Sequence, residues 1–104
     1  MERSKKAFEE AQRFIPGGVN SPVRAFKAVG GNPVFIERGA GSKIYDIDGN
    51  EYVDWILGLG PLTLGYSHPV INDAIRRQLT DGILFSLPHK LEAEVAEMLC
   101  EVIP

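Results

Sequence analysis

Residues 34–56, VFIERGAGSKIYDIDGNEYVDWI, decide the fold because they hold three short strand candidates in succession. Apolar, β-branched and aromatic residues are concentrated in Val34–Arg38, Lys43–Asp46 and Glu51–Ile56, with glycine and small polar residues between them. The pair Asp48-Gly49 is a strong hairpin signal, because a primed turn needs positive φ and glycine adopts positive φ at little cost. The stretch therefore predicts a three-stranded antiparallel meander.

Three amphipathic helices are predicted around the meander. Apolar residues recur at helical spacing in Ser4–Phe14, Pro69–Leu79 and Lys90–Ile103. Gly82 follows the second helix as its C-terminal stop, since glycine readily takes the left-handed conformation found there. The last helix is expected to bury a stripe made by Leu91, Val95, Met98, Leu99 and Val102. A helix, a long loop, a three-stranded meander and two helices make an α+β fold.

The long loop, residues 16–33, separates the first helix from the meander. It holds three Pro and four Gly, and its apolar residues are spread along it, which favours a functional loop over a linker. Ser21 and Arg24 lie three residues apart in this loop. A guanidinium is a natural fork for a carboxylate or a phosphate, and a nearby hydroxyl adds a second donor. From the residues alone, a binding role and a plain surface arginine both stay open.

The composition excludes several classes of protein. The 104 residues are 44% hydrophobic and 24% charged, which is ordinary for a globular protein and argues against disorder. The net charge of −3 comes without a basic stripe, so nucleic acid is not an expected partner. The longest apolar stretch, Trp55–Leu64, is interrupted by Gly and Pro and is too short to span a membrane. No leader pattern is visible and Cys100 is the only cysteine, so we expect a cytoplasmic protein without an internal disulfide.

The other polar residues predict neither a metal site nor a catalytic constellation. His68 and His89 lie too far apart in the sequence for the spacing of zinc ligands. No pattern of Ser, His and Asp indicates a nucleophile, and Asp46, Asp48 and Asp54 suit turns and strand ends better than acid–base work. His68 is a candidate cap for the helix that follows it.

Residues 16–27, PGGVNSPVRAFK, closely resemble the signature N-terminal stretch of the glutamate-1-semialdehyde 2,1-aminomutase family. Two further segments, YDIDGN at 45–50 and LGYSHP at 64–69, resemble features of the wider class III aminotransferases. The resemblance extends over nearly the whole chain. Its first motif is specific to the aminomutases, whereas the other two are shared by the superfamily.

The resemblance implies the fold-type-I architecture of pyridoxal-phosphate (PLP) enzymes, in chains several times longer than this one. Residues 1–104 would then form the N-terminal segment of the small domain, with the first approach to the PLP-binding large domain. Such enzymes are homodimers that act on small amino substrates with pyridoxal 5′-phosphate or pyridoxamine 5′-phosphate as cofactor. By resemblance, Arg24 binds the substrate carboxylate and Ser21 lies beside it.

The family's cofactor residues do not carry over to any position of this chain. In the family, the phosphate-cradling motif, the Asp at the pyridine nitrogen and the Schiff-base lysine all come further along the chain. Neither Lys27 nor Lys43 matches that lysine. PLP chemistry needs both the lysine and a partner for the pyridine nitrogen. Residues 1–104 alone are therefore expected to be inactive and to bind no cofactor, and none of them is predicted to be catalytic.

Two positions depart from the aminomutase pattern. Leu59 stands where the aminomutases have a tryptophan that faces the substrate, and Tyr66 replaces a histidine of the family. A leucine in place of tryptophan leaves room for a bulkier substrate, so Leu59 is a third candidate substrate-binding residue.

Three functions stay open at this stage. The first is an aminomutase that converts glutamate-1-semialdehyde to 5-aminolevulinate for porphyrin biosynthesis. The second is a class III aminotransferase acting on a different amino substrate, which Leu59 favours. The third is a stand-alone, non-catalytic binding or assembly module, against which the apolar faces of the predicted helices argue.

Overall fold

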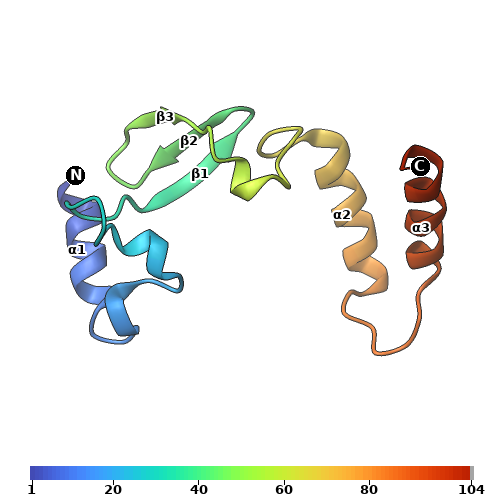
Figure 1. Cartoon of the computed structure of the whole chain (residues 1–104), viewed down its shortest axis with the longest axis horizontal. Coiled ribbons are helices and arrows are strands. Elements are labelled where there is room, and N and C mark those ends of the chain that lie inside the picture. The colour runs from blue at the N-terminus through green and yellow to red at the C-terminus, as the bar shows by residue number, and fades with distance from the viewer. Residues whose placement is uncertain (104) are drawn as a thin grey trace. The chain divides into compact units, whose positions relative to one another are not determined.

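The computed structural model describes residues 1–103, which fall into two compact units (Figure 1). The first unit is Met1–His68 and the second begins at Pro69. The first unit contains the first helix, the long loop and the meander, and the second contains the last two helices.

The meander has the predicted topology. Strands β1 (Ile36–Ala40), β2 (Lys43–Asp46) and β3 (Glu51–Val53) form one antiparallel sheet in the order β1-β2-β3. Tyr45 on the central strand pairs with Arg38 on one side and with Glu51 on the other. The Arg38 guanidinium lies 3.4 Å from the centre of the Tyr45 ring, a cation–π contact that ties β1 to β2.

The outer strands differ from their predicted bounds. β1 begins two residues later than expected, at Ile36, and continues to Ala40. β3 ends at Val53 instead of Ile56. Its chain turns there because the Asp54 carboxylate accepts hydrogen bonds from the backbone N–H groups of Ile56 (2.8 Å) and Leu57 (3.3 Å). Such a local carboxylate-to-backbone pattern competes with strand pairing.

The turn between β2 and β3 contains the predicted Asp48-Gly49 pair, but it is not a primed two-residue turn. The Gly49 N–H donates to the Asp46 carbonyl (3.1 Å), and in this turn only Gly49, at φ 91°, has a positive φ. A turn followed by a left-handed glycine is the next most common hairpin connection. The Asp46 side chain supports it by accepting from the Asp48 N–H (3.0 Å) and the Asn50 N–H (2.8 Å).

Helix α1 spans Glu2–Ala11, whereas the sequence predicts Ser4–Phe14. It starts earlier because a carboxylate from another part of the chain, Asp48, binds the N–H groups at its start. The long loop that follows contains two 3₁₀ turns, η1 (Pro16–Gly18) and η2 (Pro22–Ala25). The loop is therefore ordered by local turns without joining the sheet.

The most deeply buried side chains of the first unit are polar. Ser4 and Asp46 are each 1% exposed and Asp54 is 9% exposed, while Ala25 is the buried hydrophobic residue among those described. Polar groups buried in this way must be hydrogen-bonded to be stable. Hydrogen bonds between segments distant in the sequence therefore hold this unit together more than a large apolar core does.

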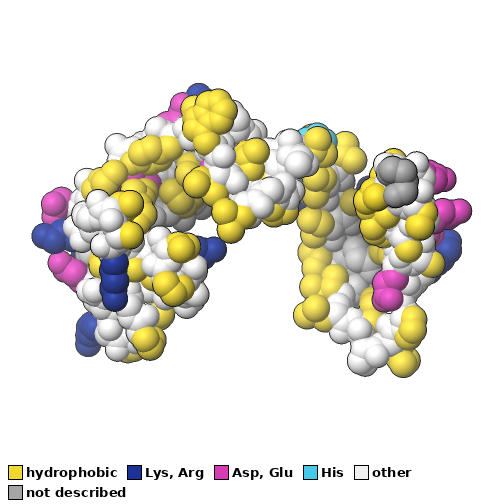
Figure 2. Space-filling view, viewed as in Figure 1, with side chains coloured by type: hydrophobic (Ala, Val, Ile, Leu, Met, Phe, Trp, Pro, Cys, Tyr) yellow, Lys and Arg dark blue, Asp and Glu magenta, His cyan; other side chains and the backbone are white. Residues whose placement is uncertain are grey.

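The second unit consists of α2 (Pro69–Asp81), a loop and α3 (Lys90–Val102), close to the predicted helices. Gly82 ends α2 with φ 100°, as predicted. The prediction of a buried α3 stripe is wrong for this chain, because two helices and a loop offer too little surface to cover it. Hydrophobic side chains lie at the surface of this unit (Figure 2), and the exposed stripe of α3 comprises Leu91, Val95, Met98, Leu99 and Val102.

Candidate functional site

The loop between α1 and the meander places Ser21 and Arg24 on one 3₁₀ turn. Ser21 precedes η2 in extended conformation, and its carbonyl accepts a hydrogen bond from the Arg24 N–H (3.0 Å). The turn directs the small side chain of Ala25 inward, where it is 6% exposed, and leaves Arg24 exposed. Ser21 is half-buried. The structure thus brings the two predicted binding residues together, while their role stays a prediction.

The Arg24 guanidinium has no intramolecular counter-ion among residues 1–103. The carboxylates that form ion pairs in this part of the chain belong to Asp48, Glu51, Asp73 and Glu94, and their partners are other cations. An exposed guanidinium that no local carboxylate neutralises keeps its fork of N–H donors available for an external carboxylate or phosphate.

A hollow of about 420 Å³ lies in the same loop. Lys27, a second cation that forms no ion pair within the described residues, is among the residues that line it. The full lining is Pro16, Gly17, Val19, Asn20, Pro22, Ala25 and Lys27. The sequence comparison excluded Lys27 as the Schiff-base lysine and missed its place beside this hollow. The spacing of three residues between Arg24 and Lys27 was the sequence signal that could have indicated a second cation at this site.

Phe26 lies between these two cations in a left-handed conformation, with φ 58° and ψ 11°. Its carbonyl accepts hydrogen bonds from the N–H groups of Val29 (3.1 Å) and Gly30 (2.7 Å), which reverse the chain after η2. A non-glycine residue in this region carries backbone strain of order 1–3 kcal/mol. Such strain is concentrated at functional sites, which agrees with a binding role for the loop.

Leu59, the third predicted site residue, lies in a strained turn of its own. Leu57, Gly58, Leu59 and Gly60 all have positive φ, at 51°, 62°, 68° and 122°. The Leu59 side chain is 89% exposed, so packing within this chain does not explain the strain. Leu59 does not line the hollow of the Arg24 loop. The structure therefore shows Leu59 as an outward-facing side chain and does not bring it into that hollow.

Tyr66, which replaces a histidine of the aminomutase pattern, is part of the frame that holds this region. Its hydroxyl donates to the Asp54 Oδ2 atom (2.6 Å), and its backbone pairs with Gly41 in both directions. The hydrogen bond from Tyr66 holds the pKa of the Asp54 carboxyl below its ordinary value, and the same bond raises the pKa of Tyr66. Tyr66 therefore serves the structure of the segment that follows β3.

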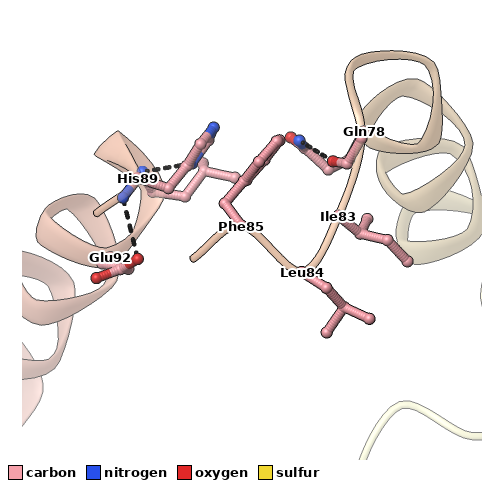
Figure 3. Close-up of a pocket in the computed structure, with 8 residues that line it drawn as sticks. Gln78, Ile83, Leu84, Phe85, His89 and Glu92 are labelled. Carbon is pink, nitrogen blue, oxygen red and sulfur yellow. Dashed lines mark hydrogen bonds between the residues drawn. The ribbon is translucent and has the colours of Figure 1, made fainter. Parts of the chain in front are cut away.

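A second hollow, of about 330 Å³, lies in the second unit between the end of α2 and the start of α3 (Figure 3). Its polar groups are already engaged. The Gln78 side-chain amide donates to the Gly82 carbonyl (2.9 Å), and His89 and Glu92 form the capping box of α3. The ring of Phe85 is stacked on that of His89, with 5.3 Å between centroids. This hollow is therefore better explained by helix capping than by ligand binding.

No group of three or more His, Cys, Asp and Glu side chains within residues 1–103 is placed to hold a metal ion. None of the helices described is long and apolar enough to cross a membrane. The predicted capping role of His68 is not seen, because its Nδ1 atom is buried without a hydrogen-bond partner among these residues. The capping histidine is His89, which sequence reasoning missed because histidine is not among the preferred capping residues.

The chain belongs to the class-III aminotransferase family, because the model of that family (Aminotransferase class-III) matches residues 26–104. Among curated proteins, it is 56% identical over 103 residues to the glutamate-1-semialdehyde 2,1-aminomutase of Syntrophomonas wolfei, covering 99% of this chain and 24% of that protein. It is 54% identical, with the same coverage, to glutamate-1-semialdehyde 2,1-aminomutase 2 of Brevibacillus brevis. The chain thus spans about a quarter of the length of the curated relatives it matches.

Solved structures confirm the predicted fold. The chain superposes on a glutamate-1-semialdehyde aminomutase from Pseudomonas aeruginosa with a TM-score of 0.82 at 31% identity, covering 96% of this chain and 22% of that one. A variant of that enzyme was solved in complex with PMP. A β-phenylalanine aminotransferase from Variovorax paradoxus gives a TM-score of 0.84 at 33% identity, covering 96% of this chain and 23% of that one. The α+β arrangement is therefore the N-terminal part of a PLP-dependent transferase fold.

Proposed function

We propose that this chain is the N-terminal portion of a PLP-dependent aminomutase that converts glutamate-1-semialdehyde to 5-aminolevulinate for porphyrin biosynthesis. The observation that carries the proposal is 56% identity over 103 residues to a curated enzyme of that name. The loop motif at residues 16–27 adds specific support. On this proposal, residues 1–104 form the N-terminal segment of the small domain with the first approach to the large one, in a cytoplasmic homodimer.

Arg24 binds the carboxylate of this substrate and Ser21 lies beside it. The support is geometric: both residues share one turn, and the exposed guanidinium has no carboxylate partner among residues 1–103. A charge-assisted, bidentate contact of this kind also orients the substrate. The opposite end of the substrate, which carries the amine and the aldehyde, is thereby placed for chemistry elsewhere in the protein.

PLP supplies an electron sink for amine chemistry when it is bound. By resemblance, no lysine of this chain matches its covalent partner, and two of the five lysines are engaged in ion pairs. Lys43 is paired with Glu51 across the sheet, which raises the pKa of Lys43, and Lys90 is paired with Glu94 on α3. We therefore assign no described residue to the cofactor, and the role proposed for this chain is in substrate binding.

A class III aminotransferase acting on another amino substrate is the second candidate. Leu59 favours it, because a leucine stands where the aminomutases carry a substrate-facing tryptophan. The side chain is 89% exposed and free to line a wider pocket in the whole protein. The similarity to a β-phenylalanine aminotransferase also supports this candidate.

The two candidates differ in their need for a co-substrate. Glutamate-1-semialdehyde and 5-aminolevulinate are isomers, so an aminomutase needs no amine acceptor, whereas an aminotransferase does. The test is to purify the full protein that carries this chain, supply PLP, and measure 5-aminolevulinate formed from glutamate-1-semialdehyde with and without added 2-oxo acid. Formation without the 2-oxo acid supports the aminomutase. Turnover of other amines that depends on the 2-oxo acid supports the aminotransferase.

The Leu59→Trp variant sharpens this comparison. If Leu59 lines the substrate pocket, the variant shifts kcat/KM toward glutamate-1-semialdehyde and away from bulkier amines. Unchanged relative kcat/KM across substrates would remove Leu59 from the pocket. A full protein of only 11.4 kDa that binds no PLP would instead support the stand-alone module.

A further inference from the structure

The carboxylate of Asp48 binds the start of α1 across more than forty residues of sequence. Its Oδ1 atom accepts from the Arg3 N–H (2.8 Å), and its Oδ2 atom accepts from the Ser4 N–H (2.9 Å) and from the Ser4 hydroxyl (2.6 Å). The terminal ammonium of Met1 lies 3.7 Å from Oδ1. A carboxylate satisfies the free N–H groups of a helix start and complements its positive end. The β2–β3 turn thus fixes the position of α1.

Ser4 joins this contact to the far end of the Arg24 loop. Ser4 is 1% exposed. Its hydroxyl oxygen also accepts a hydrogen bond from the Phe35 N–H (3.4 Å). Phe35 is the second residue after the loop, and its carbonyl accepts a hydrogen bond from the Ile47 N–H (2.9 Å) of the turn. The chain therefore enters the loop from a helix anchored by Asp48 and leaves it at a residue anchored by Ser4.

The near end of the loop is shaped by close packing on α1. Gly18 is buried with φ 75°, and a Cβ atom added there would lie 2.5 Å from the Phe8 ring, so only glycine fits. The turn η1, which contains Gly18, contacts both α1 and η2. A continuous chain of contacts therefore runs from Asp48 through Ser4, α1 and η1 to the turn that carries Arg24.

The hydrogen bonds of the loop itself are local. Within residues 16–33, the backbone N–H groups of Gly18, Arg24, Val29 and Gly30 bond to carbonyls three or four residues earlier, and none bonds to the sheet. The loop's position relative to the sheet therefore depends on its anchored ends and on the Phe8–Gly18 contact.

We propose that Asp48 and Ser4 are positioning residues, which set the place of Arg24 and hence the binding of the substrate carboxylate. This inference rests on the proposed function of Arg24. Both residues act through α1 and the loop, and neither touches the substrate. Hydrogen bonds from Ser4 and the α1 backbone hold the pKa of Asp48 at about 2, so its carboxylate stays ionised at ordinary pH.

The test uses the full protein with cofactor and two probes, glutamate-1-semialdehyde and its analogue with a carboxamide in place of the carboxylate. The preference is the ratio of kcat/KM for the first probe to that for the second. Arg24→Ala should abolish it. Asp48→Asn and Ser4→Ala should each reduce it about 3- to 30-fold, mainly through KM. In the Arg24→Ala background, Asp48→Asn should have no further effect on the preference.

Asp73→Asn is the matched control, because Asp73 is an exposed carboxylate on α2 whose ion-pair partner is Arg76, on the same helix. It should leave the preference unchanged. Hydrogen exchange gives a readout independent of activity: the amides of residues 16–33 should exchange faster in Asp48→Asn than in Asp73→Asn. If Asp48→Asn fails to fold, the inference is tested with Ser4→Ala alone, since this variant keeps the two backbone hydrogen bonds to Asp48.

The outcomes separate the two claims. If Arg24→Ala keeps the preference for the carboxylate, the proposed role of Arg24 is wrong and this inference falls with it. If Arg24→Ala abolishes the preference while Asp48→Asn and Ser4→Ala keep it, only the positioning inference is overturned. Equal losses of kcat/KM for both probes would likewise overturn it, because they would indicate general destabilisation.

Discussion

At the scale of single residues, three aspartates organise the first unit. Asp46 is the most buried of them, and its carboxylate accepts from the Asn50 side chain (2.8 Å) and the Tyr52 hydroxyl (2.8 Å), besides the two backbone bonds of the turn. Burial alone would raise the pKa of Asp46, but hydrogen bonds led by those from Asn50 outweigh it and lower the pKa. The charge is therefore tolerated in the interior because every lone pair of the carboxylate is used.

The sequence predicted that Asp46, Asp48 and Asp54 serve turns and strand ends. The structure confirms this for the carboxylates of Asp46 and Asp54, whereas Asp48 lies in the turn but its carboxylate makes its hydrogen bonds to Arg3 and Ser4. The sequence did not predict that Asp48 binds α1. That contact joins residues 44 apart in sequence, and local patterns carry no information about such pairs. Turn chemistry is readable because it is local, whereas a carboxylate shared with a distant helix start is a product of the tertiary fold.

Removing the Tyr66 hydroxyl tests the Asp54 contact. We expect Tyr66→Phe to leave the Asp54 carboxylate short of one donor, which loosens the bridge between Gly41 and Tyr66. Hydrogen exchange of the two bridging amides should become about tenfold faster or more, since losing a hydrogen bond to a charged group is costly. Tyr45→Phe is the control, because it also removes a tyrosine hydroxyl but not one that bonds to Asp54. Equal exchange rates in the two variants would contradict this role for Tyr66.

At the scale of elements, the central strand was predicted best. The bounds of β2 match, because two neighbours pair with it and leave no freedom at its ends. The bounds of the outer strands differ from the predicted ones. After β3, for example, the Asp54 carboxylate binds the backbone and ends the strand. The run of positive φ at residues 57–60 was not predictable, because leucine alone carries no signal for that conformation.

The start of α3 offers a prediction at this scale. The His89 Nδ1 atom accepts from the Leu91 N–H (3.2 Å), and the Glu92 carboxylate accepts from the His89 N–H (3.0 Å). We expect His89→Ala to destabilise the first turn of α3 by about 1 kcal/mol, and His89→Ser to restore most of it. Hydrogen exchange in the first turn of α3 measures this. Lys90→Ala, which removes an exposed pair with Glu94, should have the smaller effect, and a larger one would contradict the cap.

The hydrogen bonds between the start of α1 and Asp48 of the β2–β3 turn should weaken in acid. The pKa of Asp48 is held at about 2 in the folded protein, below its ordinary value of 3.8. A carboxyl group with a lowered pKa stabilises the folded state at pH values above its ordinary pKa. That contribution is lost as the pH falls from about 4 to about 2. The protection of the Arg3 and Ser4 amides in the wild type should therefore approach that in Asp48→Asn over this range. A constant difference between the two proteins down to pH 2 would contradict it.

At the scale of the whole molecule, the chain has hydrogen bonds between distant segments and a large exposed apolar surface. Trp55, Leu59 and Leu84 are 88–96% exposed, and the residues of the α3 stripe are 44–75% exposed. Apolar area of this extent favours association. The helical periodicity predicted which residues form the α3 stripe, but the predicted burial of that stripe was wrong, because periodicity cannot tell which surface will cover it.

The site was predictable in part for a similar reason. Ser21 and Arg24 could be proposed from the sequence because loop composition and residue chemistry point to them. The place of Lys27 beside the hollow depends on how the loop folds on α1, which the sequence alone did not predict.

The most direct measurement is the effect of Arg24→Ala on kcat/KM for glutamate-1-semialdehyde in the full protein with PLP. We expect a loss of about 2–4 kcal/mol of binding, or about 30- to 1000-fold, carried mainly by KM, because a charge-assisted contact to the carboxylate disappears. Arg38→Ala, which removes a guanidinium that lies on the Tyr45 ring, is the control and should change KM little. An Arg24→Ala enzyme with unchanged kcat/KM would contradict the central claim that this loop binds the substrate.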